Sequence, residues 1–402
     1  MGNQHKGNVY MNLFASGENT QLNACVGRNG WPGTNYYANG FDSVVHTVCR
    51  DTISRGFGPD EVVYPIVFCA RHRVELFLKM QIRLIERVRG HITVSDPKLM
   101  RTHDLGALWE MYVTASGQCD PRYKEMVSLI EPAIRELSLI DPTGETFRYA
   151  YDNNNNKHLE GSVSLINIEV FYSAFCALSE GIKNAEILTD FLSDEYGTGT
   201  YTKQASRSVI ENISKELTRK SNWGKPCFRV VKNEICERYS ISQRGLSEII
   251  DVIKSHREFA FNIGVEISIE DISAEKIANF LEFRIRATAE SNKSNWRDVL
   301  LSGSGMDREF YSFLCKNYSI REMSALLALA DVSSPLCYSE AYDDLCDQYE
   351  CGESDTAEFS GYLNGRSFIA PKIILGLKKL RQISTLKYIS SVGVDVGDLP
   401  FF

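Results

Sequence analysis

The sequence lacks the excess of positive charge that proteins coating nucleic acid nonspecifically carry. Its 402 residues include 44 Lys and Arg against 52 Asp and Glu, which gives a net charge of −8. Nonspecific binding to a phosphate backbone depends on counterion release over a broad cationic surface, and this balance does not supply one. Any contact with nucleic acid is therefore expected to come from a local basic face.

Long apolar runs and ordered cysteine motifs are also absent. No stretch reaches the roughly 18 apolar residues of a membrane-spanning helix, and neither end shows the cationic-then-apolar pattern of a secretory signal. The eleven cysteines are irregularly spaced, and the closest pair, Cys346 and Cys351, has no histidine nearby. We therefore expect reduced thiols in a cytoplasmic protein, without a metal site, a cofactor or a membrane segment.

The motifs of several large enzyme classes are missing. The sequence contains no Gly-x-Ser-x-Gly elbow, no phosphate loop ending in Gly-Lys-Ser/Thr and no His-Glu-x-x-His pair. Each of these motifs places a nucleophile, a phosphate cradle or two zinc ligands at a fixed position. Their absence disfavours hydrolases of those classes, and the "SGSG" at 302–305 is interpreted as a loop.

What the sequence does contain is helical periodicity. With 43% hydrophobic and 24% charged residues, the composition is that of a globular protein. Apolar residues recur every three or four positions through long stretches, the spacing that lines one face of a helix. We predict an all-α fold. Helices are expected at 41–53, 62–88, 101–115, 121–141 and 164–196, the last as one helix or as two separated at Gly181, and again at 273–290, 321–332 and 371–390.

The length predicts two or three domains. Residues 1–58 are rich in Gly and Asn and are expected to form an irregular lead-in with one helix. Residues 59–197 are expected to form a helical bundle. The composition changes near 196–202, where we place the boundary, and residues 203–402 are expected to form a second, mostly helical domain.

Charge is segregated within the second domain. The basic segment 203–257 has twelve Lys or Arg and six Asp or Glu, whereas the acidic segment 331–360 has nine acidic residues and no Lys or Arg. The acidic segment is expected either to cover a basic surface on the same chain or on a partner, or to be solvated.

A ladder of charges lies in the middle of the 62–88 helix. Arg71, Glu75 and Lys79 follow one another at four-residue steps and so share one helix face, with His72 beside them. The simpler interpretation is an exposed salt-bridged face, worth only about 0.3 to 0.5 kcal/mol per pair. The alternative is that this face meets another helix and forms a polar cleft.

The next helix begins near a polar tripeptide. Thr102 or His103 is expected to cap it, with Asp104 in the first turn, where a carboxylate meets the positive end of the helix.

Three short motifs carry a family resemblance. "YPIVFCARHRVELFLK" (64–79), "THDLGALW" (102–109) and "FRYAYD" (147–152) occur in the order typical of the HEPN superfamily, and look like the HEPN-like proteins of bacterial anti-phage defence and toxin loci. The resemblance covers about residues 40–197. It implies a helical bundle acting on RNA as a metal-independent endoribonuclease, commonly as a homodimer, with a catalytic Arg and His separated by four to six residues.

That Arg–His spacing does not occur here. None of the seven histidines has an arginine five to seven positions before it; Arg87 is four and Arg83 eight positions before His91. RNA cleavage through the 2′-OH still needs a proton-transfer group that titrates near neutral pH and a cation for the phosphate. We expect His72 or His103 to supply the first and Arg71 the second. A buried structural cluster of the same residues is the alternative. The candidate catalytic residues are Arg71, His72, Glu75, Lys79, His103 and Asp104, with Glu75 and Asp104 orienting their neighbours, and Arg148 is expected to anchor the loop that follows it.

Residues 233–259 have the layout of a helix-turn-helix, with Ser242 as the cap of its second helix. This layout makes DNA a possible partner besides RNA. It also supports a competing class, a non-catalytic sensor or scaffold in a defence complex. The candidate nucleic-acid-binding residues are Lys232, Arg238, Gln243 and Arg244. Within 371–390, Lys378, Lys379 and Arg381 lie near an apolar stripe that is a candidate subunit interface.

Overall fold

The regular secondary structure of the described residues consists of helices joined by loops. The computed structural model describes residues 14–29, 33–56, 58–88, 101–152, 154–291, 305–352, 356–365 and 368–398. Within these ranges the only pairing between extended residues is an isolated bridge of Tyr151 with Lys157, which confirms the all-α prediction. The chain divides into two compact units, Met1–Ser193 and Asp194–Phe402, so the division falls shortly before the expected boundary at 196–202.

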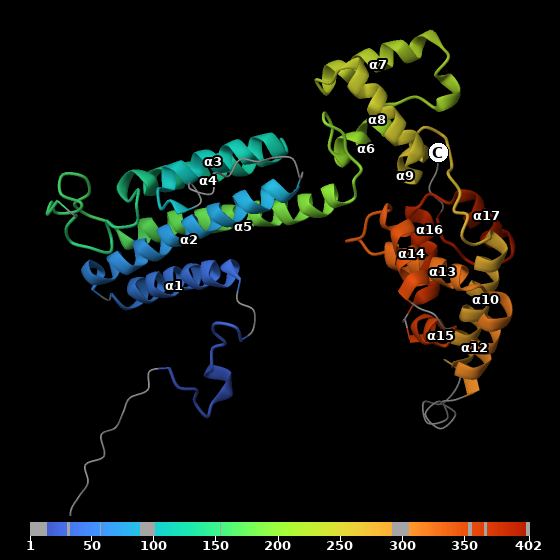
Figure 1. Ribbon diagram of the computed structural model, residues 1–402, viewed down its shortest axis with the longest axis horizontal. Coiled ribbons are helices and arrows are strands. Elements are labelled where there is room, and N and C mark those ends of the chain that lie inside the picture. Colours follow the sequence, from blue (N-terminus) through green and yellow to red (C-terminus); the bar gives the residue numbers. More distant parts are fainter. Residues whose placement is uncertain are drawn as a thin grey trace, which may run out of the picture. The chain divides into compact units, whose positions relative to one another are not determined.

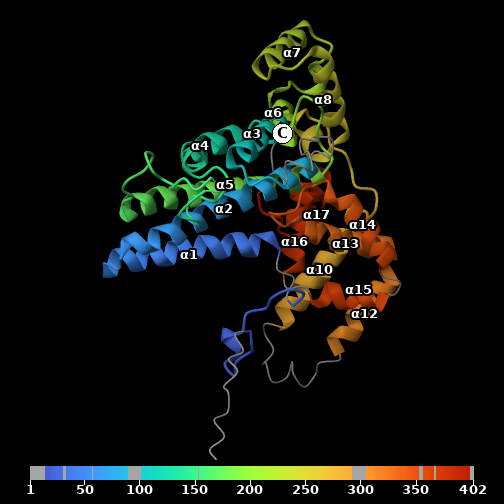
Figure 2. The same ribbon diagram turned by 60° about the vertical axis from the view of Figure 1, so that its left-hand side comes forward.

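The N-terminal unit is a bundle of long helices. Figures 1 and 2 show α2 and α5 in the middle, with α1 on one side and the α3–α4 pair on the other. Apolar faces of all these helices meet in the core, as in the fully buried Val74, Leu108 and Ile182. Its elements are η1 (Thr20–Leu22), α1 (Thr34–Arg55), α2 (Pro59–Val88), α3 (Leu105–Cys119), α4 (Tyr123–Ile140) and α5 (Ile168–Gly197).

One proline lies deeper in its helix than the first turn, and one glycine lies inside a continuous helix, the first of the two alternatives for 164–196. Helix α2 begins at Pro59, so Pro65 lies inside the helix and not in its first turn. Helix α5 is continuous through Gly181, because this glycine packs against α4 and does not end a helix. A Cβ at Gly181 would lie 2.5 Å from Ile130 Cγ2.

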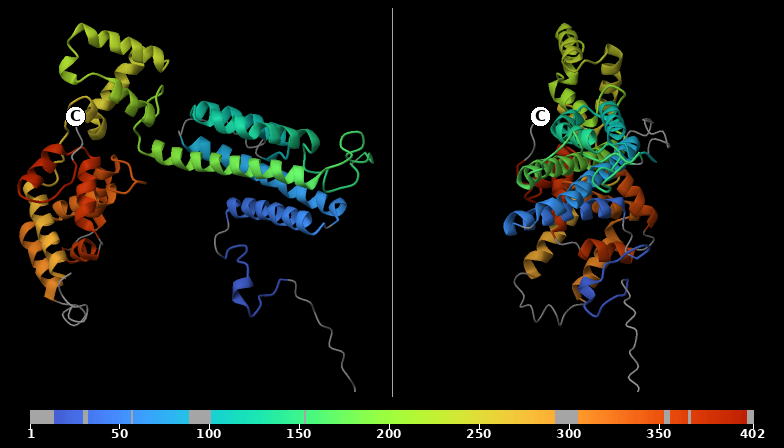
Figure 3. Two further views of the ribbon diagram at one scale, coloured as in Figure 1. Left: turned by 180° about the vertical axis from the view of Figure 1, so that it is seen from behind. Right: turned by 90° about the vertical axis from the view of Figure 1, so that its left-hand side faces the viewer.

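The C-terminal unit has two hydrophobic cores. One lies among α6–α9 and includes Ile210, Ile249 and Phe259, and the other lies among α10–α17. Figure 3 shows the two groups of helices in yellow-green and in orange to red. The elements are α6 (Arg207–Glu216), η3 (Lys220–Asn222), α7 (Pro226–Arg238), α8 (Gln243–Ser255), α9 (Arg257–Asn262), α10 (Ala274–Ser291), α12 (Gly305–Asn317), α13 (Ile320–Val332), α14 (Ala341–Gly352), α15 (Thr356–Gly365), α16 (Ile369–Lys379) and α17 (Ile383–Ser391).

Helix α13 lies at the centre of the second core. Its residues from Met323 to Ala330 are buried without interruption, because α14, α15 and α16 pack around it. The helix begins with a complete capping box in which Ser319 and Glu322 satisfy each other's backbone N–H. Helix α16 crosses α13 closely at Gly376. A Cβ added to Gly376 would lie 2.0 Å from the carbonyl oxygen of Leu329.

The acidic segment contacts the basic segment of the same chain. Arg207 Nε donates to Glu340 Oε1 at 2.6 Å, His256 Nε2 lies 3.1 Å from the same oxygen, and Arg257 pairs with Asp343 at 2.6 Å. Burial acts to raise the pKa of Glu340, but the contacts with His256 and Arg207 lower it more, so the net shift is downward. The acidic segment 331–360 was expected to contact basic residues of this chain or of a partner, or to be solvated. For Glu340 and Asp343 the contact within the same chain is therefore confirmed.

The stretch 371–390 forms two helices, and its cations do not all face outward. The chain turns between α16 and α17 at Arg381, whose φ is +57°. Lys379 Nζ donates to the backbone carbonyls of Ser334, at 2.7 Å, and Cys337. Lys379 therefore ties α16 to the chain after α13, so its ammonium has partners inside the unit.

Replacing Gly376 by Ala is expected to destabilise the C-terminal unit by about 2 kcal/mol or more, because the new methyl group meets backbone that cannot rotate away. Urea unfolding followed by circular dichroism measures the change. Gly361→Ala is the matched control. Gly361 also lies in a helix but has open space around its Cβ direction, so Ala should leave stability unchanged or raise it slightly. Equal stability of the two variants would contradict the close helix crossing.

Candidate functional site

Five side chains from α2 and the start of α3 meet around one carboxylate. We call Arg71, His72, Glu75, Lys79 and His103 the Glu75 cluster. Glu75 Oε1 accepts from Lys79 Nζ at 2.7 Å and lies 2.9 Å from His103 Nδ1. Glu75 Oε2 pairs with Arg71 and lies 3.8 Å from His72 Nδ1. The ladder of α2 therefore faces the beginning of α3 and is not a solvated row of salt bridges.

Arg71 is buried and joins three segments of the chain through hydrogen bonds of its guanidinium. Its side chain is 2% exposed, and besides Glu75 it donates to the backbone carbonyls of His103, Pro142 at 2.9 Å and Asp141 at 3.3 Å. Gly144 packs against this guanidinium: a Cβ there would lie 3.2 Å from Arg71 Cζ, and its φ is +81°. Arg71 is thus engaged with protein acceptors, whereas the sequence analysis assigned it to a phosphate.

The charge of Glu75 is held by its neighbours. Burial alone acts to raise the pKa of this carboxyl, but His72, Lys79 and Arg71 lower it more, so the net pKa is well below the ordinary value of 4.5. Glu75 is therefore ionised at neutral pH and accepts hydrogen bonds. An imidazole whose Nδ1 donates to such a carboxylate keeps Nε2 as the acceptor.

The carboxylate at the centre of the Glu75 cluster is buried, whereas the imidazoles at its edge are partly exposed to solvent. The side chain of Glu75 is 3% exposed, Lys79 17%, His72 28% and His103 67%. The two imidazoles are thus within reach of solvent while the carboxylate that they share is not. Asp104 stands apart: it is the N-cap of α3, and its Oδ1 accepts from Ala107 N at 3.0 Å. The cap is therefore Asp104 itself and not Thr102 or His103.

Aromatic rings flank His72. Its imidazole stacks on Phe68 with an interplanar angle of 7° and meets the edge of Phe41 at 4.6 Å between centroids. The exposed Arg148 guanidinium lies 5.6 Å from the ring centre of Phe68 and 5.0 Å from that of Tyr149. Phe41 and Phe68 carry no signal in the sequence that marks them as site residues, because their spacing is that of any helix face.

A second buried cation of α2 was also missed. Arg73 is 1% exposed and donates to Glu186 of α5 at 3.1 Å, and its Nε lies 3.9 Å from Asp42 of α1. Asp42 in turn accepts from Ser179 Oγ at 2.7 Å. Since every partner is inside the bundle, Arg73 ties α2 to α1 and α5.

The four predicted nucleic-acid-binding residues lie on α7 and α8. Ser242 caps α8 by accepting from Gly245 N at 3.0 Å, as expected, and Gln243 donates to Asn233 at 2.9 Å. Arg244 is 91% exposed and lies 3.4 Å from Glu248. Arg238 instead pairs with Glu216 at 2.8 Å, and Lys232 lies over the Phe228 ring. Of the four, Arg238, Gln243 and Arg244 are exposed, the last two at the start of α8.

The comparisons with known proteins give no further assignment. A scan of protein-family models, a search of curated proteins and a search of solved structures each found no match for this chain. Among the described residues, no group of three or more His, Cys, Asp or Glu has the arrangement of a metal site, and no helix has the length and apolarity to cross a bilayer. All eleven cysteines are free thiols.

Replacing Glu75 by Gln is expected to destabilise the chain by about 3 kcal/mol or more at pH 7, because Arg71 loses its buried counter-charge. Glu75 has a folded-state pKa below its unfolded value, so its contribution is present above that unfolded value and is lost as the pH falls. The difference between wild type and Glu75→Gln in urea unfolding should therefore shrink between about pH 5 and pH 3.

The control for this measurement is Glu180→Gln, which alters an exposed carboxylate on α5. It should change stability by less than about 0.5 kcal/mol at either pH. If the two variants behaved alike, the carboxylate at Glu75 would not hold the cluster together.

Proposed function

We propose that this chain is a HEPN-like, RNA-directed protein of a bacterial defence or toxin system whose N-terminal unit is a metal-independent endoribonuclease. The observation that carries the proposal is the pair of solvent-reachable imidazoles, His72 and His103, set on one ionised carboxylate beside an ammonium. A metal-independent cleavage through the ribose 2′-OH needs two proton-transfer groups and a cation, and the Glu75 cluster contains these groups.

The roles follow from the contacts. Glu75 accepts from His103 Nδ1, so His103 Nε2 is available to take the proton of the 2′-OH. His72, which lies beside the same carboxylate, donates a proton to the 5′-oxygen that leaves. Lys79 supplies positive charge for the phosphate. Arg71 acts as a positioning residue, since its donors hold the start of α3 and with it His103.

The surroundings of His72 favour a single strand as substrate. Phe68 and the exposed Arg148 and Tyr149 present aromatic and guanidinium planes next to the imidazole. Bases that are splayed out of a helix stack on such planes without sequence preference. The proposed substrate is therefore an unpaired stretch of RNA, and the family resemblance implies a homodimer as the active form.

The test is cleavage of a structured RNA by the purified protein in the presence of a chelator. His103→Asn keeps a donor toward Glu75 but cannot titrate, and His72→Phe keeps the stack on Phe68 without a titratable ring. Each is expected to lower the rate by about 10²-fold or more in a chain that circular dichroism shows to be folded.

Lys124→Ala, an exposed change on α4, is the control and should cleave at the wild-type rate. The enzyme proposal is rejected if the wild-type protein leaves the RNA intact or if both histidine variants cleave at the wild-type rate. The non-catalytic sensor or scaffold then remains.

A second candidate function is favoured by one observation in the C-terminal unit. Helix α8 begins at a side-chain cap with Gln243 and the highly exposed Arg244 on its first turn, and packs against α7 as in a helix-turn-helix. Such a helix start can enter the major groove, and Gln and Arg read adenine and guanine there. Under this alternative the chain is a non-catalytic, nucleic-acid-binding subunit of a defence complex.

Fluorescence anisotropy with a mixed-sequence DNA duplex tests the alternative. The double variant Gln243→Ala, Arg244→Ala should weaken binding about tenfold, because two contacts of the first turn are lost. Lys254→Ala at the other end of α8, where the ammonium already pairs with Asp251, should bind like wild type. Absence of binding by the wild-type chain would reject this function without affecting the RNA assay.

A further inference from the structure

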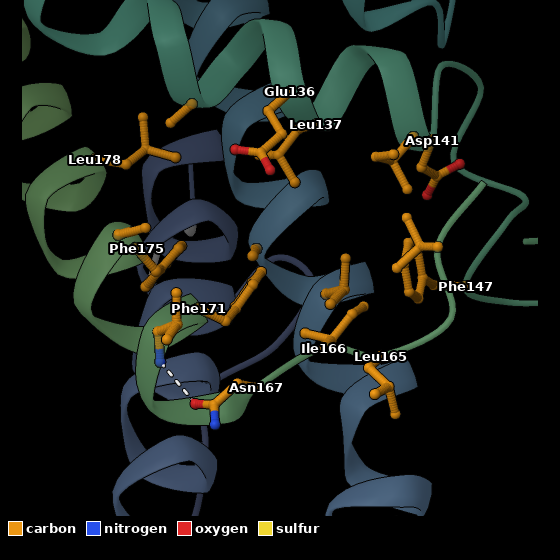
Figure 4. Close-up of a pocket in the computed structure, with 17 residues that line it drawn as sticks. Glu136, Leu137, Asp141, Phe147, Leu165, Ile166, Asn167, Phe171, Phe175 and Leu178 are labelled. Atoms are coloured by element: carbon orange, nitrogen blue, oxygen red, sulfur yellow. Dashed lines mark hydrogen bonds between the residues drawn. The ribbon is translucent and has the colours of Figure 1, made fainter.

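The N-terminal unit contains an apolar pocket whose lining does not suit a phosphate. The pocket has a volume of about 350 Å³ and lies between α2, α4, α5 and the segment before α5. Figure 4 shows Phe171 and Phe175 of α5 on one side of it and Leu137 of α4 above. Its ionisable residues are Glu136 and Asp141, and the described residues that line it include no Lys, Arg or His. A surface for phosphates outside the Glu75 cluster is instead found in the C-terminal unit.

Five cations of the C-terminal unit follow one another along the chain without an acidic residue between them. Between Leu217 and Asn233 the sequence contains no Asp or Glu, and its basic residues there are Arg219, Lys220, Lys225, Arg229 and Lys232. We call these five residues the 219–232 cation patch. Four of them are exposed and Lys232 is half-buried. In a chain with a net charge of −8, the patch is a local basic face.

The patch differs from neighbouring cations in having no carboxylate partner. Lys215 Nζ pairs with Glu211 at 2.6 Å, and Lys254 Nζ pairs with Asp251 at 2.6 Å. In contrast, no carboxylate of the described residues lies within 4.0 Å of a charged nitrogen of the patch. Like charges that are close together repel one another, and a bound polyanion removes this repulsion. The patch therefore favours an anionic partner more than the paired lysines do.

Two aromatic rings hold the loop that carries the first part of the patch. Trp223 stacks on Phe228 with 4.9 Å between ring centroids, and its Nε1 donates to the carbonyl of Thr218 at 2.8 Å. The backbone N–H of Lys220 donates to the carbonyl of Ile263 at 2.8 Å, which ties the loop to the end of α9. The rings are thus used to fix the loop, and the exposed cations extend from a backbone that is held in place.

The second part of the patch forms a row along α7. Lys225 is the N-cap of this helix, and Arg229 and Lys232 follow after four and three residues, so the three side chains share one helix face. Seven residues of helix span about 10 Å. The acidic residues of α7, Glu234 and Glu237, lie in its second half, beyond this row.

We propose that the 219–232 cation patch binds the phosphodiester backbone of a nucleic acid. A row of unpaired cations neutralises successive phosphates and releases their counterions, and such contacts carry no sequence information. An anionic bilayer fits less well, because binding to its surface also uses exposed apolar side chains, and the large hydrophobic residue exposed here is Val230. This proposal depends neither on RNA cleavage at the Glu75 cluster nor on base reading by α8.

The experiment is fluorescence anisotropy of the full chain with a labelled oligothymidine of about 30 nucleotides. This probe has no 2′-OH and so cannot be cleaved by the proposed route, which keeps the result separate from that of the RNA assay. Five phosphate contacts predict a slope of about −3.5 for log K against log salt, so the affinity should fall about 10²-fold from about 50 to about 200 mM salt. A 2′-O-methyl oligouridine of the same length should bind within about threefold, since it shares the backbone.

Two double variants separate the patch from the general charge of the chain. Lys220→Ala with Arg229→Ala removes two exposed, unpaired cations, and should weaken binding about tenfold at the lower salt and reduce the slope by about 1.4. Lys215→Ala with Lys254→Ala changes the net charge by the same amount but removes cations that already have carboxylate partners. This control should bind within about twofold of wild type.

Several results would overturn the proposal. They are a wild-type chain that binds neither oligonucleotide, equal binding by the two double variants, and an affinity that does not change with salt. Phosphatidylserine vesicles and polyglutamate serve as other polyanions. If either bound as tightly as the oligothymidine, the patch would be assigned to a membrane surface or to an acidic protein and not to a nucleic acid.

Discussion

The N-terminal unit depends on the burial of the Arg71–Glu75 pair. Removing two opposite charges from water is costly unless the remaining donors and acceptors are also satisfied. Here the guanidinium finds three backbone carbonyls and the carboxylate finds Lys79 and an imidazole. The satisfied pair fixes the start of α3 and the end of α4 against α2. His72 and His103 lie at the edge of this pair. Both are next to the Glu75 carboxylate and both are reached by solvent, so they are the groups available for chemistry.

The C-terminal unit also buries an ion pair, at the place where its two hydrophobic cores meet. Arg207 of α6 is largely buried between the rings of Phe259 and Tyr338 and pairs with Glu340, which the chain presents just before α14. A cation that stacks on aromatic planes keeps its charge and still packs like an apolar group. The basic residues of 203–257 and the acidic residues of 331–360 are thus partly paired with each other inside the unit, and do not only charge its surface.

Helical periodicity was enough to predict the all-α fold, because the apolar repeats of α2, α4 and α13 are long. The position of caps was harder: Thr102, His103 and Asp104 are adjacent and polar, and only the path of the chain decides that Asp104 caps α3. The sequence left open whether Gly181 divides the last helix of the unit, and packing against α4 decides for one continuous helix.

Parts of the candidate site have no sequence signal at all. The ladder at Arg71, Glu75 and Lys79 could be found from its four-residue steps, and its meeting with His103 was one of two open interpretations. That Arg71 binds backbone carbonyls could not be predicted, because every residue offers a carbonyl. The approach of Arg148 to Phe68 joins positions far apart in the chain, and the pocket beside Asp141 is lined by several separate segments.

The partners of Arg71 bear on how the unit assembles. The carbonyls of His103 and Pro142 lie 32 and 71 residues further along the chain, so a newly formed α2 has neither of them. Until both segments arrive, collapse around α2 would trap a guanidinium whose hydration has been stripped without replacement, and that intermediate is unfavourable. We therefore expect α3 and α4 to dock on α2 together, since either one alone leaves part of the buried guanidinium without acceptors.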